Sequence, residues 1–204
     1  MKEKKRSIWF HLFDVVLNIV IILAIVGMIR TFLVSPFQVE GSSMIPTLED
    51  NQYIIINKLA YYIGDPERGD TVVFRPPTDN KKHYVKRVIG VPGDKVSIRG
   101  GKVYLTVPGE AEVELEEEYL DERNTGRTFQ HPPSSGNTRA ATYEVPEDAY
   151  FLLGDNRQGS LDSRSFAATG ESAFVPDKDI KGRVWFVALP FTKMHALTPP
   201  MYSL

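Results

Sequence analysis

Cysteine is absent from this 204-residue sequence, which excludes disulfide bonds and thiolate metal sites. The four histidines are scattered and show no zinc-ligand spacing: His11, His83, His131 and His195. The sequence also lacks the G-x-x-x-x-G-K-[ST] loop that holds phosphate and the G-x-S-x-G turn of α/β-hydrolases, and nothing in its pattern points to a Ser-His-Asp triad. We therefore expect a protein that uses no metal ion and no cofactor.

A strong charge of one sign is also missing. The formal net charge is −2, so the sequence has no electrostatic signature of a nucleic-acid-binding protein. The charge is unevenly distributed, because the KEKKR segment at residues 2–6 contributes +3 and the remaining chain therefore carries −5. An acidic body with a basic N-terminal tip is not the pattern of a DNA-binding protein, and we expect no nucleic-acid partner.

Long apolar runs are missing too, with one exception near the N-terminus. Residues 15–29 are apolar except for Asn18 and Gly27, and the stretch 12–34 exceeds the about 20 residues that a helix needs to cross a bilayer. A buried core helix, a cleaved signal peptide and an uncleaved signal anchor are the three interpretations. The uniform apolarity argues against a core helix, whereas Arg30 and the lack of an A-x-A pattern argue against cleavage.

The uncleaved anchor is the interpretation that we favour. By the positive-inside rule, the basic tip stays in the cytoplasm and everything after the anchor is exported. We therefore predict a cytoplasmic tip at residues 1–11, a single-pass transmembrane anchor at 12–34, and a domain at 35–204 on the outer face of the cell membrane.

The exported domain has the pattern of a mainly β protein. β-branched or aromatic runs of strand length, separated by Gly and Pro, occur at residues 51–59, 70–74, 83–90, 149–155 and 180–190. The segment 95–107 predicts a hairpin that turns at Gly100 and Gly101. No helical periodicity appears beyond the anchor, so we expect sheets with short helical turns at most.

Residues 110–148 differ in composition from the predicted strands. EAEVELEEEYLDE is densely acidic, and the segment that follows is polar and contains paired prolines. We interpret this region as a solvated excursion or a flexible insertion. The alternative is a specific acidic recognition surface.

The segment EGSSMIPTL at residues 40–48 places two serines beside apolar residues, directly after the apolar run. A serine nucleophile needs a base, and a lysine can serve when desolvation keeps it neutral. Lys86 suits this role, because strand alternation puts Tyr84 and Val88 on its face. The alternative is a lysine whose stem packs while its ammonium reaches solvent or a carboxylate.

A polar loop, LLGDNRQGSLDSRSF, follows a predicted strand at residues 152–166. One interpretation is a turn in which Asp155, Arg157, Asp162 and Arg164 pair locally. The other is a polar shelf that orients neighbouring catalytic groups. The residues alone leave both open.

Together these segments resemble the bacterial type I signal peptidases, or leader peptidases, of the prokaryotic Ser-Lys type. The motifs that carry the resemblance occur in the family's order: IRTFLVSPF, GSSMIPTL, RGDTVVF, YVKRVIGVPGDKV and GDNRQGSLDSR. Only the region 110–148 lacks a counterpart. The eukaryotic-type enzymes carry histidine at the position of Lys86, which argues against that branch.

The resemblance implies a role for each matching residue. Ser43 matches the nucleophile, Lys86 the general base, and Ser160 a serine that hydrogen-bonds the lysine amine. The residues that match those shaping the site are Asp155, Arg157, Asp162 and Arg164. In the family, the nucleophile's backbone N–H forms the oxyanion hole, and some members add a serine hydroxyl from two residues earlier. That position is Gly41 here, which leaves the second donor open.

The resemblance further implies a membrane-bound serine endopeptidase with an extracytoplasmic domain of coiled antiparallel β-sheets. It would cleave signal peptides from exported preproteins after small residues, by acyl transfer and without a cofactor. Its partners would be signal peptides, the lipid bilayer and the translocation machinery.

Two hypotheses from other classes compete with this one. Self-cleaving stress-response repressors use a related Ser-Lys β domain, but they carry a DNA-binding helical domain where this chain has its apolar segment. A non-enzymatic anchored β module could instead bind a partner through the acidic region 110–148.

Overall fold

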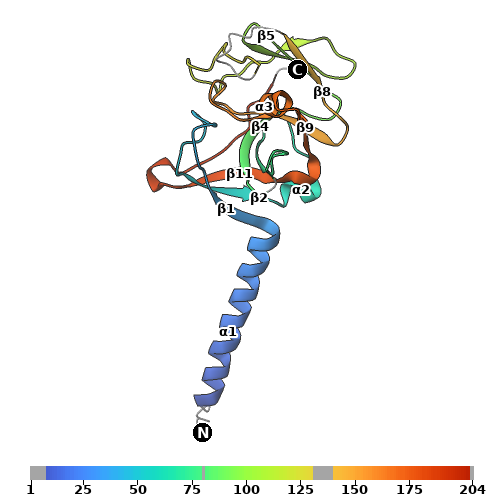
Figure 1. The fold of residues 1–204 in the computed structure, drawn as a ribbon. Coiled ribbons are helices and arrows are strands. Elements are labelled where there is room, and N and C mark those ends of the chain that lie inside the picture. Colours follow the sequence, from blue (N-terminus) through green and yellow to red (C-terminus); the bar gives the residue numbers. More distant parts are fainter. Residues whose placement is uncertain (1–7, 80, 131–139, 203–204) are drawn as a thin grey trace.

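A computed structural model describes residues 8–79, 81–130 and 140–202 of the chain. It begins with helix α1 (Ile8–Met28), which continues through a π-helical turn (Ile29–Leu33) into strand β1 (Val34–Gln38). The helix projects from the body as an isolated rod, and none of its residues is buried (Figure 1). Its 21 residues span about 30 Å, which matches the hydrocarbon thickness of a bilayer.

Helix α1 is, within the described ranges, the one helix long and apolar enough to cross a membrane. The side-chain amide of Asn18 has a partner inside this helix, because it donates to the Asp14 carbonyl at 2.7 Å. The helix starts inside the predicted tip, whose residues 1–7 lie outside the described residues. The anchor was predicted to extend to residue 34, but this residue already belongs to strand β1. A proline disfavours helical geometry at the residue before it, which is Ser35 here.

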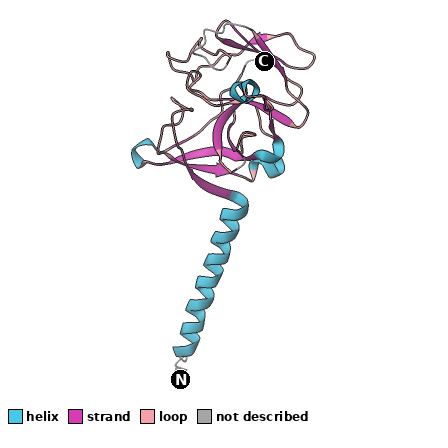
Figure 2. Ribbon diagram, in the orientation of Figure 1, coloured by secondary structure: helices cyan, strands magenta, loops and turns pink. Residues whose placement is uncertain are grey.

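The body consists of two antiparallel sheets and a few short helices (Figure 2). The larger sheet has the order β1-β2-β11-β3-β4-β9-β10, with β12 paired to β11. Its other strands are β2 (Tyr53–Asn57), β3 (Thr71–Phe74), β4 (Tyr84–Gly90), β9 (Ala149–Leu153), β10 (Val175–Pro176), β11 (Ile180–Leu189) and β12 (His195–Ala196). The smaller sheet has the order β7-β6-β5-β8: β5 (Lys95–Arg99), β6 (Lys102–Thr106), β7 (Val113–Glu114) and β8 (Ala141–Glu144).

The predicted fold class is confirmed. Each predicted strand run contains a strand, and the predicted hairpin is β5–β6, in which Val96 faces Leu105 and Ile98 faces Val103. Gly101 turns at φ +81°, a conformation that favours glycine. The short helices are α2 (Ala60–Ile63) and α3 (Ser163–Ala168). Strands β1, β7, β8, β10 and β12 escaped the sequence analysis, because most of them are short or polar.

The region 110–148 differs from the expected solvated excursion, although its residues 131–139 lie outside the described residues. Strands β7 and β8 extend the smaller sheet on either side of the β5–β6 hairpin. Leu115, Asn124 and Thr128 are buried. The insertion is therefore largely a structural part of the domain, because backbone pairing and a few buried side chains compensate for its polar composition.

Three apolar clusters fix the positions of the sheets. One cluster lies between the two sheets and includes Ile89, Val96 and Phe151. Another includes Met44 and Leu48, which fasten the loop between β1 and β2 to the larger sheet. The third packs Phe166 of α3 against strands β3, β4, β9 and β10. The two loops that carry the predicted site residues are thus anchored to the same sheet.

Candidate active site

Ser43 lies in the loop between β1 and β2, and its neighbours hold it in place. Met44 is 1% exposed, and its carbonyl accepts a hydrogen bond from the Leu48 N–H at 2.9 Å. The Ser43 carbonyl accepts from the N–H of Asn156 at 3.0 Å, which ties this loop to the loop after β9. The apolar residues of the SSMIPTL segment therefore form the anchor of a fixed loop that presents a serine.

Lys86 lies in the middle of β4, between β3 and β9, and is 3% exposed. Its Nζ is 2.7 Å from the Ser43 Oγ and also donates to the Val85 carbonyl at 2.8 Å. Burial lowers the pKa of Lys86 to about 8, although the negative charges of Asp162 and Asp155 oppose this shift. About one molecule in ten then has a neutral amine at pH 7, compared with one in a few thousand for an exposed lysine.

Ser160 is buried beside this pair, but it does not form the hydrogen bond to the lysine that the resemblance implied. Its Oγ makes no hydrogen bond of standard geometry among the described residues, although it lies near enough to the Asp162 carboxylate to help lower the pKa of that acid. The hydrogen bonds of the Lys86 amine go instead to the Ser43 hydroxyl and the Val85 carbonyl. The site therefore holds one unsatisfied buried hydroxyl, which is able to bond a further group.

Asp155 supports the strand that carries Lys86. Both of its oxygens accept hydrogen bonds from the buried guanidinium of Arg87, at 2.9 and 2.7 Å. The same guanidinium donates to the Gly69 carbonyl at 2.8 Å. Arg87 is the residue next to Lys86, so its bidentate bond to Asp155 fixes the backbone at the lysine. Because neighbouring side chains of a strand point to opposite faces of the sheet, the Arg87 cation does not lie on the face of Lys86.

Asp162 and Arg164 form a local pair, in which the Nη2–Oδ2 distance is 2.7 Å. Asp162 also caps the N-terminus of α3 and accepts a hydrogen bond from the Gly154 N–H at 3.1 Å. Burial opposes its ionisation, but the Arg164 guanidinium holds the pKa of Asp162 below its usual range. The loop therefore keeps a negative charge near the buried lysine, which limits how far the lysine pKa falls.

Arg157 has no ion-pair partner within the described part of this loop, where its Nε donates only to the Gly154 carbonyl at 3.1 Å, and its charge is paired with the insertion instead. Its guanidinium, which is fully buried, bonds both carboxylate oxygens of Glu117 at 2.5 and 2.9 Å. It also donates to the Thr128 hydroxyl at 2.7 Å. Of the four charged residues of this loop, Asp162 and Arg164 pair with each other, whereas Asp155 and Arg157 pair with residues far away in the sequence. The loop is therefore neither a purely locally paired turn nor only a shelf that orients catalytic groups.

Sequence reasoning missed three contributors to this arrangement: Arg87, Glu117 and Gly154. A Cβ built on Gly154 would lie 2.1 Å from the Ser160 Oγ and 2.6 Å from the Ser43 carbonyl oxygen, so only glycine fits between the two loops. The sequence signal for Gly154 was its position in the LLGDNR segment, where a strand meets a polar loop, because a glycine at such a place often marks a close approach of two backbones. No comparable signal pointed to Glu117, because it stands among many acids.

The backbone N–H of Ser43, which the resemblance implies as the oxyanion donor, is free to bind a substrate oxygen. Within the described part of the chain, no acceptor binds the backbone N–H of Ser43. The N–H of Gly41, by contrast, donates to Asp50 Oδ1 at 2.7 Å. Gly41 has a φ of +90°, and a Cβ at this position would meet no atom within 4 Å.

A cleft of about 510 Å³ opens onto Ser43 and Lys86. Its apolar lining comes from four strands and includes Phe37 of β1, Ile54 of β2, Val73 of β3 and Val85 of β4. The arrangement thus combines a hydroxyl, a desolvated amine, a free N–H and an apolar cleft. These are the parts that serine-nucleophile acyl transfer requires.

Comparisons with known proteins agree with this chemistry. The family model for signal peptidase, peptidase S26, matches residues 12–189. Signal peptidase I P of Bacillus subtilis subsp. natto is 38% identical over 194 residues, which cover 95% of this chain and 97% of that protein. Signal peptidase I U of Bacillus subtilis (strain 168) is 36% identical over 195 residues, which cover 95% and 94%.

A crystal structure of a signal peptidase I from Enterococcus faecalis V583 is 29% identical in sequence and has a TM-score of 0.44, over 59% of this chain and 97% of that chain. The family-model match and the Bacillus relatives extend over most of the sequence, including both loops and the strand described above. This chain belongs to the signal peptidase family, peptidase family S26.

Proposed function

We propose that Ser43 and Lys86 form the nucleophile–base pair with which this serine peptidase removes signal peptides from exported preproteins. The observation that carries the proposal is the 2.7 Å contact between the Ser43 Oγ and an Nζ that is buried and depressed in pKa. Membership in the family supplies the reaction, and the geometry supports the assignment of these two residues.

The first half of the reaction forms an acyl-enzyme. Neutral Lys86 takes the proton of the Ser43 hydroxyl as the oxygen attacks the scissile carbonyl. The free N–H of Ser43 stabilises the oxyanion that develops. The resulting Lys86 ammonium then gives its proton to the leaving amine of the mature protein, whose peptide bond breaks.

The second half releases the signal peptide. Lys86, neutral again, takes a proton from a water molecule that attacks the ester carbonyl, and the Ser43 oxygen leaves with a proton from the lysine. The unsatisfied Ser160 hydroxyl lies beside this exchange, and we assign it the task of orienting the amine. Asp155, Arg157, Asp162 and Arg164 act as positioning residues through the pairs described above.

We further propose that the substrate binds in an extended conformation, with small side chains at the first and third positions before the cut. Alternate side chains of a strand point to the same side, so these two positions face the same wall of the cleft. A preprotein with bulky residues at both positions should therefore be cleaved far more slowly than one with alanine. Equal rates would contradict this part of the proposal.

Members of the family are membrane-anchored, and α1 is the candidate anchor. We propose that it crosses the cell membrane with the N-terminus in the cytoplasm and the β domain on the outer face, beside the bilayer and the translocation machinery. Protease added to spheroplasts should then digest the β domain and leave the N-terminal segment protected. Protection of the β domain would reverse the proposed orientation.

The assignment of the nucleophile is tested by preprotein cleavage with purified full-length protein in detergent. Ser43→Ala should abolish cleavage. Ser42→Ala is the matched control, since this exposed neighbour has no side-chain hydrogen bond in the described structure, and it should cleave at close to the wild-type rate. Cleavage by Ser43→Ala, or its loss in Ser42→Ala alone, would refute the assignment.

A further inference from the structure

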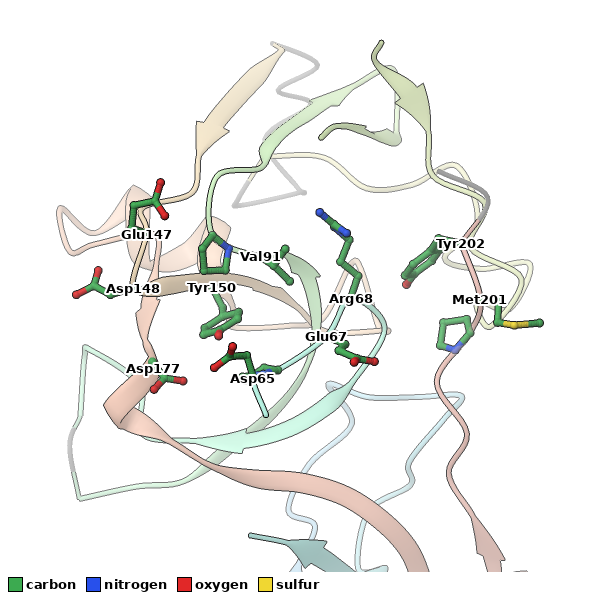
Figure 3. Close-up of a pocket in the computed structure, with 13 residues that line it drawn as sticks. Asp65, Glu67, Arg68, Val91, Glu147, Asp148, Tyr150, Asp177, Met201 and Tyr202 are labelled. Carbon is green, nitrogen blue, oxygen red and sulfur yellow. The ribbon is translucent and has the colours of Figure 1, made fainter. Parts of the chain in front are cut away.

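A second cavity, of about 910 Å³, lies at the junction of the two sheets and shares no residue with the cleft at Ser43 (Figure 3). Its lining includes Asp65 and Asp177, whose carboxylates alone define no ligand. The described residues with a buried, unsatisfied side-chain atom are Asn124 and Ser160, and neither of them lines this cavity. A side chain that the mechanism leaves without a role lies instead beside the nucleophile.

Asn156, in the loop after β9, bonds both peptide groups that flank the Cα atom of Ser43. Its backbone N–H donates to the Ser43 carbonyl at 3.0 Å, and its side-chain Nδ2 donates to the Ser42 carbonyl at 3.1 Å. The backbone bond does not depend on which side chain stands at position 156, whereas the second bond requires the amide. The side chain of Asn156 therefore acts on one peptide group, the one that joins Ser42 to Ser43.

This same peptide group carries the proposed oxyanion donor. A trans peptide bond is planar, so the N–H of Ser43 points opposite to the carbonyl of Ser42. A donor that holds the carbonyl toward the loop after β9 thus directs the N–H away from that loop. One other group shares this task, because the backbone N–H of Ile45 donates to the Ser42 carbonyl at 3.2 Å.

Gly159 fixes the orientation of the Asn156 amide. Its N–H donates to the Oδ1 of Asn156 at 3.2 Å, which leaves Nδ2 for the Ser42 carbonyl. A Cβ built on Gly159 would lie 2.9 Å from this Nδ2, which is closer than a Cβ comes to other heavy atoms, so a larger residue would push the amide away. The loop therefore provides both the amide and the space that the amide needs.

We propose that Asn156 is a positioning residue for the oxyanion hole, because its amide orients the peptide group whose N–H stabilises the developing oxyanion. This inference rests on the proposed function of Ser43, whose N–H it orients. In this role Asn156 touches neither the substrate nor the reacting oxygen. Its effect comes from orientation, since a hydrogen bond weakens steeply as the donor turns away from the acceptor. The effect is largest in the transition state, where the charge on the oxygen is largest.

The direct test is steady-state cleavage of a preprotein by the full-length protein in detergent. Loss of an entire oxyanion donor lowers kcat by about 100-fold to 1000-fold. In Asn156→Ala the N–H remains and Ile45 still holds the carbonyl, so kcat should fall about tenfold and KM should change less than about twofold. The pH dependence of kcat/KM should keep its wild-type midpoint, because no charge changes and both hydrogen bonds of the Lys86 amine remain.

A pair of peptide inhibitors separates stabilisation of the oxyanion from ground-state binding. With a peptide aldehyde that has the sequence before the cut, the Ser43 oxygen bonds to the aldehyde carbon, Lys86 takes the hydroxyl proton, and the aldehyde oxygen becomes the anion. The corresponding peptide alcohol has no carbonyl group and forms no adduct. Asn156→Ala should therefore raise the inhibition constant of the aldehyde about tenfold and change that of the alcohol less than about twofold.

The matched control is Gln158→Ala. The Gln158 amide belongs to the same loop and also donates to a backbone carbonyl, but this carbonyl belongs to Arg123 in the insertion. The control should keep kcat and both inhibition constants within about twofold of the wild-type values.

A double-mutant cycle tests whether Gly159 acts through the amide. Gly159→Ala should reproduce the loss of kcat, because the new Cβ displaces the Asn156 amide. Added to Asn156→Ala, it should lower kcat by less than about twofold more, because its target is already gone.

Three results would overturn the proposal. Equal effects on the aldehyde and the alcohol, or a rise in KM at unchanged kcat, would mean that Asn156 affects substrate binding instead. A shifted pH midpoint would mean that it acts through the lysine. Full additivity of the two substitutions would mean that Gly159 and Asn156 act separately.

Two precautions keep these outcomes decisive. Thermal unfolding identifies a variant that fails to fold, and Asn156→Leu, which keeps the approximate size of the side chain, then replaces Asn156→Ala. The proposed function is judged separately, because Ser43→Ala tests it in a chain that retains Asn156.

Discussion

The buried lysine predicts a specific pH dependence of signal-peptide cleavage. Burial lowers the pKa of Lys86 from 10.5 to about 8, and only the neutral amine can accept the Ser43 proton. kcat/KM should therefore rise about tenfold per pH unit below pH 7 and level off above about pH 8 to 9. The measurement is the initial rate of preprotein cleavage at substrate concentrations below KM, in buffers of constant ionic strength.

The same shift predicts how the stability of the domain depends on pH. The folded state binds the Lys86 proton more weakly than the unfolded state, so ionised Lys86 destabilises the fold wherever both states are protonated, which is below about pH 8. The penalty corresponds to about 3 kcal/mol, at about 1.4 kcal/mol per pKa unit. It should diminish as the pH rises from 8 to 10.5.

Two substitutions separate catalysis from structure. Lys86→Met keeps the length of the side chain and removes the charge, so the variant should be inactive and up to about 3 kcal/mol more stable at pH 7. Lys86→Arg keeps the charge, but it should also be inactive because arginine stays protonated. Urea unfolding and preprotein cleavage are measured on the same purified samples.

Three results would refute this reasoning. Substantial cleavage by either variant would remove Lys86 from the mechanism. A kcat/KM that continues to rise toward pH 10.5 would mean that burial does not depress the pKa of the base. Inactivity accompanied by unfolding in both variants would mean that Lys86 is needed for the fold rather than for proton transfer.

Three further substitutions test the surroundings of the pair. Gly154→Ala should reduce kcat/KM by about 100-fold, because the new Cβ would displace the Ser160 loop; near-normal activity would mean that the two loops can separate without loss. Gly41→Ser, at a φ of +90°, should lower stability by about 1 kcal/mol in urea unfolding and change activity little. A gain of 100-fold or more would instead reveal an incomplete oxyanion hole. Glu117→Gln leaves the buried guanidinium of Arg157 without its counterion and should cost about 3 kcal/mol of unfolding free energy; an unchanged urea midpoint would show that the pair contributes nothing.

The sequence by itself determined the elements whose signals are local. The apolar run at residues 15–29 predicts a membrane-spanning helix, because nearly every position is apolar and no core of this size could bury them all. Alternation in YVKRVIG predicts a strand with Lys86 among apolar neighbours, and Gly100-Gly101 predicts the hairpin turn. The ordered motifs around Ser43 and Lys86 identified the family, since such a set depends on residue identity alone.

Only the tertiary structure decided which distant residues meet. Glu117 is one of many acids in a polar segment, and nothing in its neighbours distinguishes the one that reaches Arg157. The pKa of Lys86 depends on the closing of β3 and β9 around β4. Contacts of this kind depend on how the two sheets coil and pack against each other, which no local sequence pattern encodes. The two partners are far apart in the sequence, so their interaction free energy contributes only when the tertiary structure has brought them together.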